Sequence, residues 1–179
     1  EGSLLALELL AGQLRTCLDE HTDIQLVSND LPLLFGVERL CGQHPVRLVV
    51  SGTTGKSGIT KFLLGSNTLN LADKCPVPLL VVPADAEFEP VRKIVFACAF
   101  HRVKDITPVD DIRYFTKKLG ANLLVLNVGM EDKRFDPDII PEQYQLHRML
   151  DDLSPKYHYV EEESIAEGIL EFVEDEEAD

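Results

Sequence analysis

Residues 46–83 decide the fold of this 179-residue chain, and they read VRLVVSGTTGKSGITKFLLGSNTLNLADKCPVPLLVVP. The stretch opens with an apolar run at residues 46–51 that only Arg47 interrupts, which is the pattern of a strand buried on both faces of a parallel sheet. A glycine-rich loop then leads into a helix predicted over residues 66–74, which prolines end. A second apolar strand is predicted at residues 79–82. The order strand, loop, helix and strand predicts a parallel α/β unit.

The rest of the chain continues the alternation of helices and strands. Apolar residues at helical spacing predict helices at residues 4–20, 33–42, 108–119, 141–153 and 164–174. Short apolar runs predict strands at residues 24–27, 94–100, 123–128 and 157–160. A loop is expected at residues 131–137. We therefore expect an α/β fold, built as a doubly wound, mainly parallel open sheet with helices on both faces.

The composition is that of an ordered, acidic, globular chain. Apolar residues make up 45% of the sequence and charged residues 27%, close to the average of folded proteins. The net charge of −14, concentrated after Lys156, argues against nucleic acid as a partner, because binding it relies on Lys and Arg. No segment reaches the roughly 18 apolar residues of a membrane span, and the scattered cysteines fit a reducing compartment. We expect a cytoplasmic protein without a membrane partner.

The triplet Gly55-Lys56-Ser57 raises the question of an ATPase phosphate loop. That loop has the pattern G-x-x-x-x-G-K-[ST], whose first glycine lets the chain turn around the phosphate. Counting back from Gly55, this position is Val50, inside the predicted strand. A β-branched residue there does not make the turn. A P-loop-like NTPase therefore ranks last among the functions considered.

The glycines themselves predict a different kind of anion site. Gly52 and Gly55 allow sharp turns after the strand, and Gly65 with Ser66 opens a helix. The first N–H groups of a helix favour phosphate, so two glycine elements would clamp one anion at the carboxyl end of the sheet. The alternative is that the glycines only make a flexible loop, and the spacing does not decide between the two.

A family resemblance adds to these patterns. Residues 51–83, SGTTGKSGITKFLLGSNTLNLADKCPVPLLVVP, resemble the carboxyl-terminal half of a universal stress protein domain, whose nucleotide-binding members use G-x-x-G-x9-G-[ST]. The resemblance implies a nucleotide-binding α-hydrolase-like fold with sheet order 3-2-1-4-5, and ATP or AMP bound where strands 1 and 4 meet. It implies a nucleotide-binding site made of Gly52, Thr53, Thr54, Gly55, Lys56, Gly65, Ser66 and Asn67.

The resemblance also divides the chain into two incomplete domains. Residues 1–83 are similar to the second half of one domain, and residues 84–90 are a linker. VRKIVFACAF then opens residues 91–179, which are similar to the first half of another domain, so the chain looks like a fragment of a tandem universal stress protein. The halves are complementary, and we predict that the strand in VRKIVFACAF pairs beside the strand at residues 46–51, within the chain or across a dimer. The alternative is two ordinary domains in a longer protein.

The functional prediction follows from the glycine-rich loop and from the absence of the Asp that nucleotide-binding members of the family place at the end of the first strand. Nucleotide-binding members place an Asp at the end of the first strand, where this chain has Ala99, which offers the nucleoside no acceptor. The five histidines show no paired-ligand spacing, so no metal site is expected, and no catalytic nucleophile is recognised. We predict a regulatory, non-catalytic stress-response protein that binds ATP or AMP. The alternative is an oligomeric interaction module without nucleotide, and the resemblance implies a homodimer joined through residues 79–82.

Overall fold

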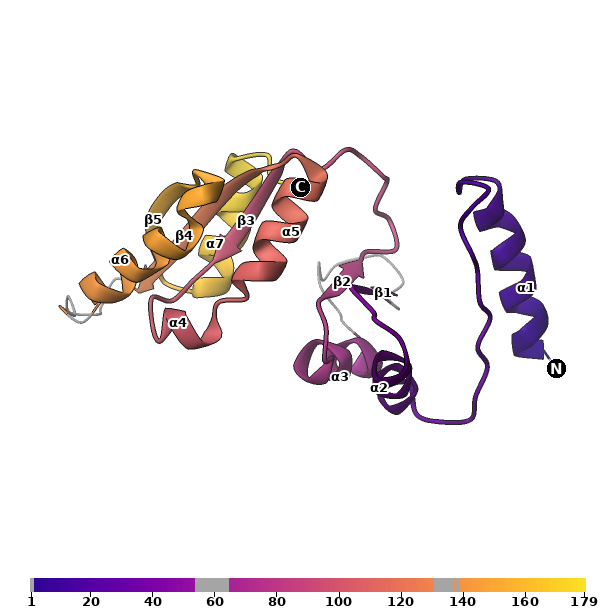
Figure 1. Ribbon diagram of the computed structural model, residues 1–179. Helices are drawn as coiled ribbons and strands as arrows, with labels where there is room; N and C mark the ends of the chain where they lie inside the picture. Colours follow the sequence, from indigo (N-terminus) through magenta and orange to yellow (C-terminus); the bar gives the residue numbers. More distant parts are fainter. Residues whose placement is uncertain (1, 54–64, 131–136, 138) are drawn as a thin grey trace. The chain divides into compact units, whose positions relative to one another are not determined.

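The computed structural model describes residues 2–53, 65–130, 137 and 139–179 (Figure 1). The chain divides into two compact units, residues 1–86 and 87–179. Helices and parallel strands alternate in both units, which confirms the predicted α/β class.

The first unit contains a two-stranded parallel sheet. Its elements in chain order are α1 (Gly2–Arg15), α2 (Leu33–Gln43), β1 (Val49–Gly52), α3 (Ser66–Lys74) and β2 (Leu79–Val82). α3 packs against α2 and β2, and it buries Leu71 and Thr68. Val50 and Leu80 lie opposite each other in the register and are 60% and 49% exposed, so this pair is about half open among the described residues.

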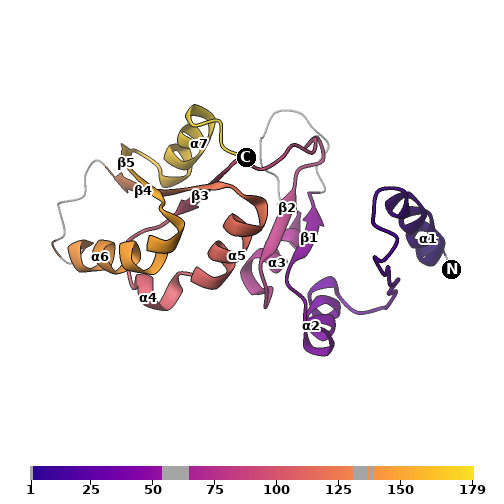
Figure 2. The same cartoon turned by 45° about the horizontal axis from the view of Figure 1, so that its top comes forward.

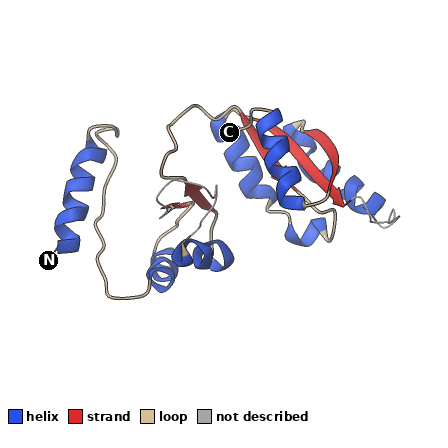
Figure 3. Ribbon diagram, turned by 180° about the vertical axis from the view of Figure 1, so that it is seen from behind, coloured by secondary structure: helices blue, strands red, loops and turns tan. Residues whose placement is uncertain are grey.

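The second unit contains a three-stranded parallel sheet in the order β3-β4-β5. Its elements are β3 (Lys93–Ala97), α4 (Val103–Ile106), α5 (Val109–Leu119), β4 (Asn122–Met130), α6 (Ile139–Leu150), a 3-10 turn (Asp151–Leu153), β5 (Lys156–Glu162) and α7 (Ile165–Asp175). In Figure 2, α7 covers one face of this sheet and α4, α5 and α6 lie on the other. Figure 3 shows the same strands in red between the helices.

Two apolar clusters fill the two faces of the three-stranded sheet. The cluster between the sheet and α4, α5 and α6 contains Cys98, Phe100, Val103, Leu123, Val125, Leu146 and Leu150. The cluster between the sheet and α7 contains Leu124, Leu126 and Phe172. Successive side chains of a strand point to opposite faces, so the run Leu123–Leu126 in β4 is buried on both sides. This is the burial expected of a central parallel strand.

Several predicted boundaries differ from the observed ones. The helix predicted at residues 4–20 ends at Arg15, and the helix predicted at 141–153 ends at Leu150 and continues as the 3-10 turn. The strand predicted at 94–100 starts at Lys93 and ends at Ala97. It ends there because the backbone turns at Phe100 and Arg102, which have positive φ values of 47° and 49°. The loop predicted at residues 131–137 lies, except for Pro137, outside the described residues.

The strand predicted at residues 24–27 is wrong. No strand forms there, and Leu26 and Val27 are 37% and 42% exposed. The described sheet of this unit contains β1 and β2, and residues 24–27 pair with neither of them. A mostly apolar run of only four residues does not by itself distinguish a strand from extended loop.

β1 and β3 lie in different units, each in the sheet of its own unit. The predicted pairing of β3 with β1, within the chain or across a dimer, stays a prediction. The assignment of the two units to halves of two domains also stays a prediction.

Candidate functional site

The carboxyl end of the two-stranded sheet holds the first of the predicted site residues. Gly52 is the last residue of β1 and lies opposite Val82 of β2. The next residue, Thr53, donates its backbone N–H to the Val82 carbonyl at 3.0 Å, so the pairing continues one residue past the strand. A Cβ on Gly52 would only meet the Val82 carbonyl at 3.9 Å, an ordinary contact, so the fold itself does not require glycine here. The interior of the sheet therefore gives no packing reason for this glycine.

The second group of predicted residues forms the N-terminus of α3. Gly65 is the N-cap residue, in the extended region with φ −62° and ψ 156°, and its carbonyl accepts the N–H of Leu69 at 3.0 Å. Glycine has no side-chain oxygen, so no side chain caps this helix, and the following Ser66 and Asn67 are exposed. A helix N-terminus without a side-chain cap leaves backbone N–H groups and the positive end of the helix dipole for an external anion.

The topology puts these two groups of residues at the same end of the sheet, beyond the carboxyl ends of its strands. β1 and β2 are parallel, so α3, which connects them, runs back along the sheet, and its N-terminus lies towards the carboxyl ends of the strands. The predicted residues Thr54, Gly55 and Lys56 lie between β1 and α3, outside the described residues. Val50, the position where a P-loop needs glycine, lies inside β1, which agrees with the low rank given to that motif.

Ala99 belongs to the second unit and lies beyond the end of β3. It is exposed, between buried Cys98 and buried Phe100, in the turn that the positive φ of Phe100 creates. A positive φ in a bulky residue is uncommon and needs support from its surroundings. The support includes Asn127 of β4, whose Nδ2 donates to the Cys98 carbonyl at 2.7 Å. Burial raises the pKa of the Cys98 thiol, which packs in the apolar cluster with Phe100 and Val103.

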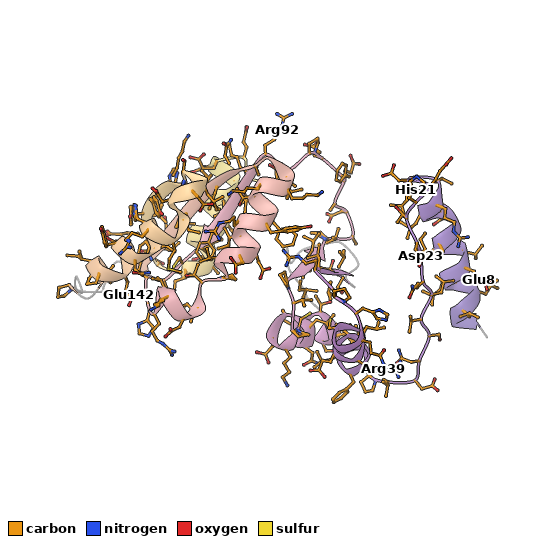
Figure 4. The ribbon with its side chains drawn as sticks, in the orientation of Figure 1. Glu8, His21, Asp23, Arg39, Arg92 and Glu142 are labelled. Atoms are coloured by element: carbon orange, nitrogen blue, oxygen red, sulfur yellow. The ribbon has the colours of Figure 1, made fainter. Side chains whose placement is uncertain are left out.

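The same turn is held on its other side by Glu142 of α6. Its Oε2 accepts the backbone N–H of Val103 at 2.7 Å, so a carboxylate caps the first turn of α4 (Figure 4). The sequence patterns single out neither Asn127 nor Glu142. The position of Asn127 inside the apolar run LLVLNV indicates a half-buried amide, and such an amide needs a hydrogen-bond partner. Glu142 gave no such signal, because its partner lies 39 residues away.

The described residues hold no cluster of three or more His, Cys, Asp or Glu that would bind a metal ion. No helix in the described ranges is long and apolar enough to cross a membrane. An open groove of about 560 Å³ lies in the first unit between α1, residues 27–31 and α2. Its lining is mostly apolar and contains none of the predicted nucleotide-binding residues.

Comparison with known proteins gives one match. Residues 36–83 match the model of the Universal stress protein family, a range that begins in α2 and ends one residue after β2. No curated protein and no solved structure matches the chain. The match contains both groups of site residues described above, and it lies wholly within the first unit.

Proposed function

We propose, from the match of residues 36–83 to the Universal stress protein family model, that this chain is a regulatory protein whose first unit binds the phosphates of ATP or AMP. The binding residues are Gly52, Thr53, Thr54, Gly55, Lys56, Gly65, Ser66 and Asn67. The observation that carries the proposal is the N-terminus of α3. It starts at Gly65 without a side-chain cap, on the carboxyl side of the parallel strands.

The chemistry of this site is binding without catalysis. Backbone N–H groups at a helix start hold phosphate oxygens through hydrogen bonds and the positive end of the helix dipole. Parallel α/β sheets generally bind ligands beyond the carboxyl ends of their strands, which is where Gly52 and Gly65 lie. Ala99 provides no carboxylate for the ribose, so phosphate contacts supply most of the affinity.

Calorimetry on the full chain tests the proposal with ATP, AMP, adenosine and inorganic tripolyphosphate as probes. We expect ATP and tripolyphosphate to bind with affinities within about threefold of each other, and adenosine to give no heat. Ser66→Glu places a negative charge at the start of α3 and should weaken ATP binding by about tenfold or more. Asn70→Glu adds the same charge at an exposed position further along α3 and should change it by less than about twofold.

A second function has its own observation. Val50 and Leu80 form an exposed apolar pair on the first sheet, which suits an oligomeric interaction module. If millimolar ATP and tripolyphosphate give no heat, the nucleotide proposal fails and the module is the better function. Equal weakening by Ser66→Glu and Asn70→Glu would place any bound nucleotide away from the start of α3.

A further inference from the structure

The carboxyl ends of α2 and α3 bring two cysteines towards each other within the first unit. The two helices pack against each other (Figure 1), and they lead into β1 and β2, which pair from Val49 and Leu79 onward. Because these strands are parallel, the segments that enter them come from the same end of the sheet. Cys41 lies in the last turn of α2, and Cys75 is the C-cap residue of α3, with its N–H donated to the Leu71 carbonyl at 2.8 Å.

Each cysteine continues the inward-facing side of its helix. In α3, Thr68, Leu71 and Cys75 follow one another at helical spacing, the first two buried and Cys75 half-buried. In α2, Leu34 and Cys41 lie two turns apart on one face, both half-buried, and neither lines the open groove beside α1. This face of α2 is therefore not the groove face, and α3 packs against α2. The packing of the two helices turns both cysteines towards the contact between them.

The two thiols also interact through their charges. Burial raises the pKa of the Cys41 thiol, and the negative charge of a Cys75 thiolate raises this pKa further. Repulsion between solvent-accessible charges is largely screened beyond about 10 Å, so the two sulfur atoms are neighbours. Both are free thiols and are half-buried, whereas Cys98 of the second unit is buried. A small oxidant therefore reaches Cys41 and Cys75 more easily than Cys98.

We propose that Cys41 and Cys75 form a disulfide when the protein meets hydrogen peroxide, and that this bond ties α2 to α3. One thiolate attacks a peroxide oxygen, the O–O bond breaks, and a sulfenic acid and water form. The second sulfur attacks the sulfenic sulfur, the S–S bond forms, and the S–O bond breaks as water leaves with the second thiol proton. Both cysteines are oxidised, and the peroxide is reduced to water.

The bond closes a loop of the chain that contains β1, the glycine-rich segment and α3. A disulfide across a loop of this length stabilises the folded state chiefly by restricting the unfolded chain. The first unit gains much from such a tie, because its described sheet has two strands, and Val50 and Leu80 remain exposed on it. In a reducing compartment disulfides are usually transient and redox-sensing, so the bond is a reversible response to oxidant.

Peptide mapping of the full chain tests the bond directly, with hydrogen peroxide as the oxidant and no nucleotide present. Trypsin places each cysteine in a peptide of its own, with Cys41 in residues 40–47 and Cys75 in residues 75–92. We expect the linked pair of these two peptides to exceed any pair that contains Cys17 or Cys98 by about tenfold or more, because the reaction is intramolecular. Dithiothreitol should return both cysteines to free thiols.

Amide hydrogen exchange of the oxidised and reduced chain measures the effect on the fold. Oxidation should slow the exchange of the Leu71 amide in α3 by about a hundredfold and leave that of Leu126 in the second unit unchanged. In Cys41→Ser and in Cys75→Ser, peroxide should neither link the two peptides nor slow exchange at Leu71. Cys17→Ser removes an exposed cysteine elsewhere in the first unit and is the matched control, with both effects kept within about twofold.

Three results overturn the proposal. The first is a peptide map in which the linked pair is missing at every peroxide concentration, whatever other oxidised forms of Cys41 and Cys75 it contains. The second is a disulfide found only between two copies of the chain. The third is a disulfide that forms within the chain without slowing exchange at Leu71, because the bond then does not stabilise α3. If Cys41→Ser unfolds the first unit, the map and the exchange of the unaltered chain still decide.

Discussion

The two units of this chain contain similar elements but differ in how completely they bury them. In the second unit, the four residues Leu123–Leu126 are at most 3% exposed, and helices cover both faces of the sheet. In the first unit, α3 packs against β2, and Val50 and Leu80 remain 60% and 49% exposed. α1 of the first unit is apolar nearly all round, and Leu5 and Leu9 are 59% and 67% exposed.

The difference shows that a segment can form regular helices and strands without burying their apolar side chains in a core. A helix that is apolar on all sides is normally buried, so α1 has the sequence of an interior element in a surface position. The same holds for β1, whose unalternated apolar run is that of a central strand although it lies at an edge. The first unit therefore has the sequence of part of a larger core, and the second unit has a core of its own.

The largest expected effect tests this contrast directly. Leu126 is fully buried against the α7 cluster, and Leu126→Ala should lower the free energy of unfolding of the second unit by about 3 kcal/mol through lost burial and a cavity. Leu80→Ala removes the same atoms from the exposed face of the first sheet and should cost less than about 1 kcal/mol. Urea unfolding followed by hydrogen exchange in each unit measures both. Equal losses would mean that Leu80 is covered in solution.

Sequence patterns predict the elements well where local signals are sufficient. The predicted bounds of α3 and β2 are the observed ones, because Gly65-Ser66 starts the helix, prolines end it and an apolar run follows. α5 ends where Gly120 predicts its end, and the structure gives Gly120 a φ of 66°, the left-handed C-cap conformation.

The patterns fail where the outcome depends on a distant partner. Residues 24–27 look like a strand but pair with neither strand of the described first unit. The turn at Phe100 and Arg102 rests on bonds from Asn127 and Glu142, which no local pattern contains. For the site, sequence patterns identify the candidate residues and the start of α3. Only the parallel pairing of β1 with β2 shows that Gly52 and Gly65 lie at the same end of the sheet.

Glycine substitutions give the next largest effect and compare the packing of one helix from each unit. A Cβ on Gly168 of α7 would lie 2.8 Å from Val128 Cγ1 and 3.0 Å from Glu162 Cγ, so Gly168→Ala should destabilise the second unit by about 1–2 kcal/mol. Gly12→Ala in α1 meets nothing within 4 Å and should stabilise its helix by up to about 1 kcal/mol. Thermal unfolding followed by circular dichroism, together with hydrogen exchange, measures whether each substitution raises or lowers the stability of its unit. A destabilising Gly12→Ala would show that α1 is packed tightly on this side.

A smaller effect follows from a buried hydroxyl in the second unit. The Tyr157 hydroxyl has no hydrogen-bond partner in the described part of the chain, and burial raises the pKa of Tyr157 to about 12. An unfolded tyrosine ionises near pH 10, so the stability from the neutral hydroxyl is complete below about pH 10 and is lost as the pH rises through about 12. Tyr157→Phe should flatten the fall in the urea midpoint between about pH 10 and 12, with little change at pH 7. Tyr144→Phe, at a 66% exposed site, is the control and should leave the profile unchanged.

The smallest effect comes from the ion pairs that join α5 to the 3-10 turn of the second unit. The Asp152 carboxylate accepts bonds from Arg113 Nε at 2.9 Å and Lys117 Nζ at 2.8 Å, and these partners hold the pKa of Asp152 well below its usual range. A lowered carboxyl pKa contributes stability above the usual value near pH 4 and loses it as the pH falls further. The pair is exposed, so Asp152→Asn should lower the urea midpoint only slightly at pH 7 and low salt, and less at high salt. Asp110→Asn, at a carboxylate that is 99% exposed, should change it even less, and a salt-independent loss at Asp152 would assign it a packing role instead.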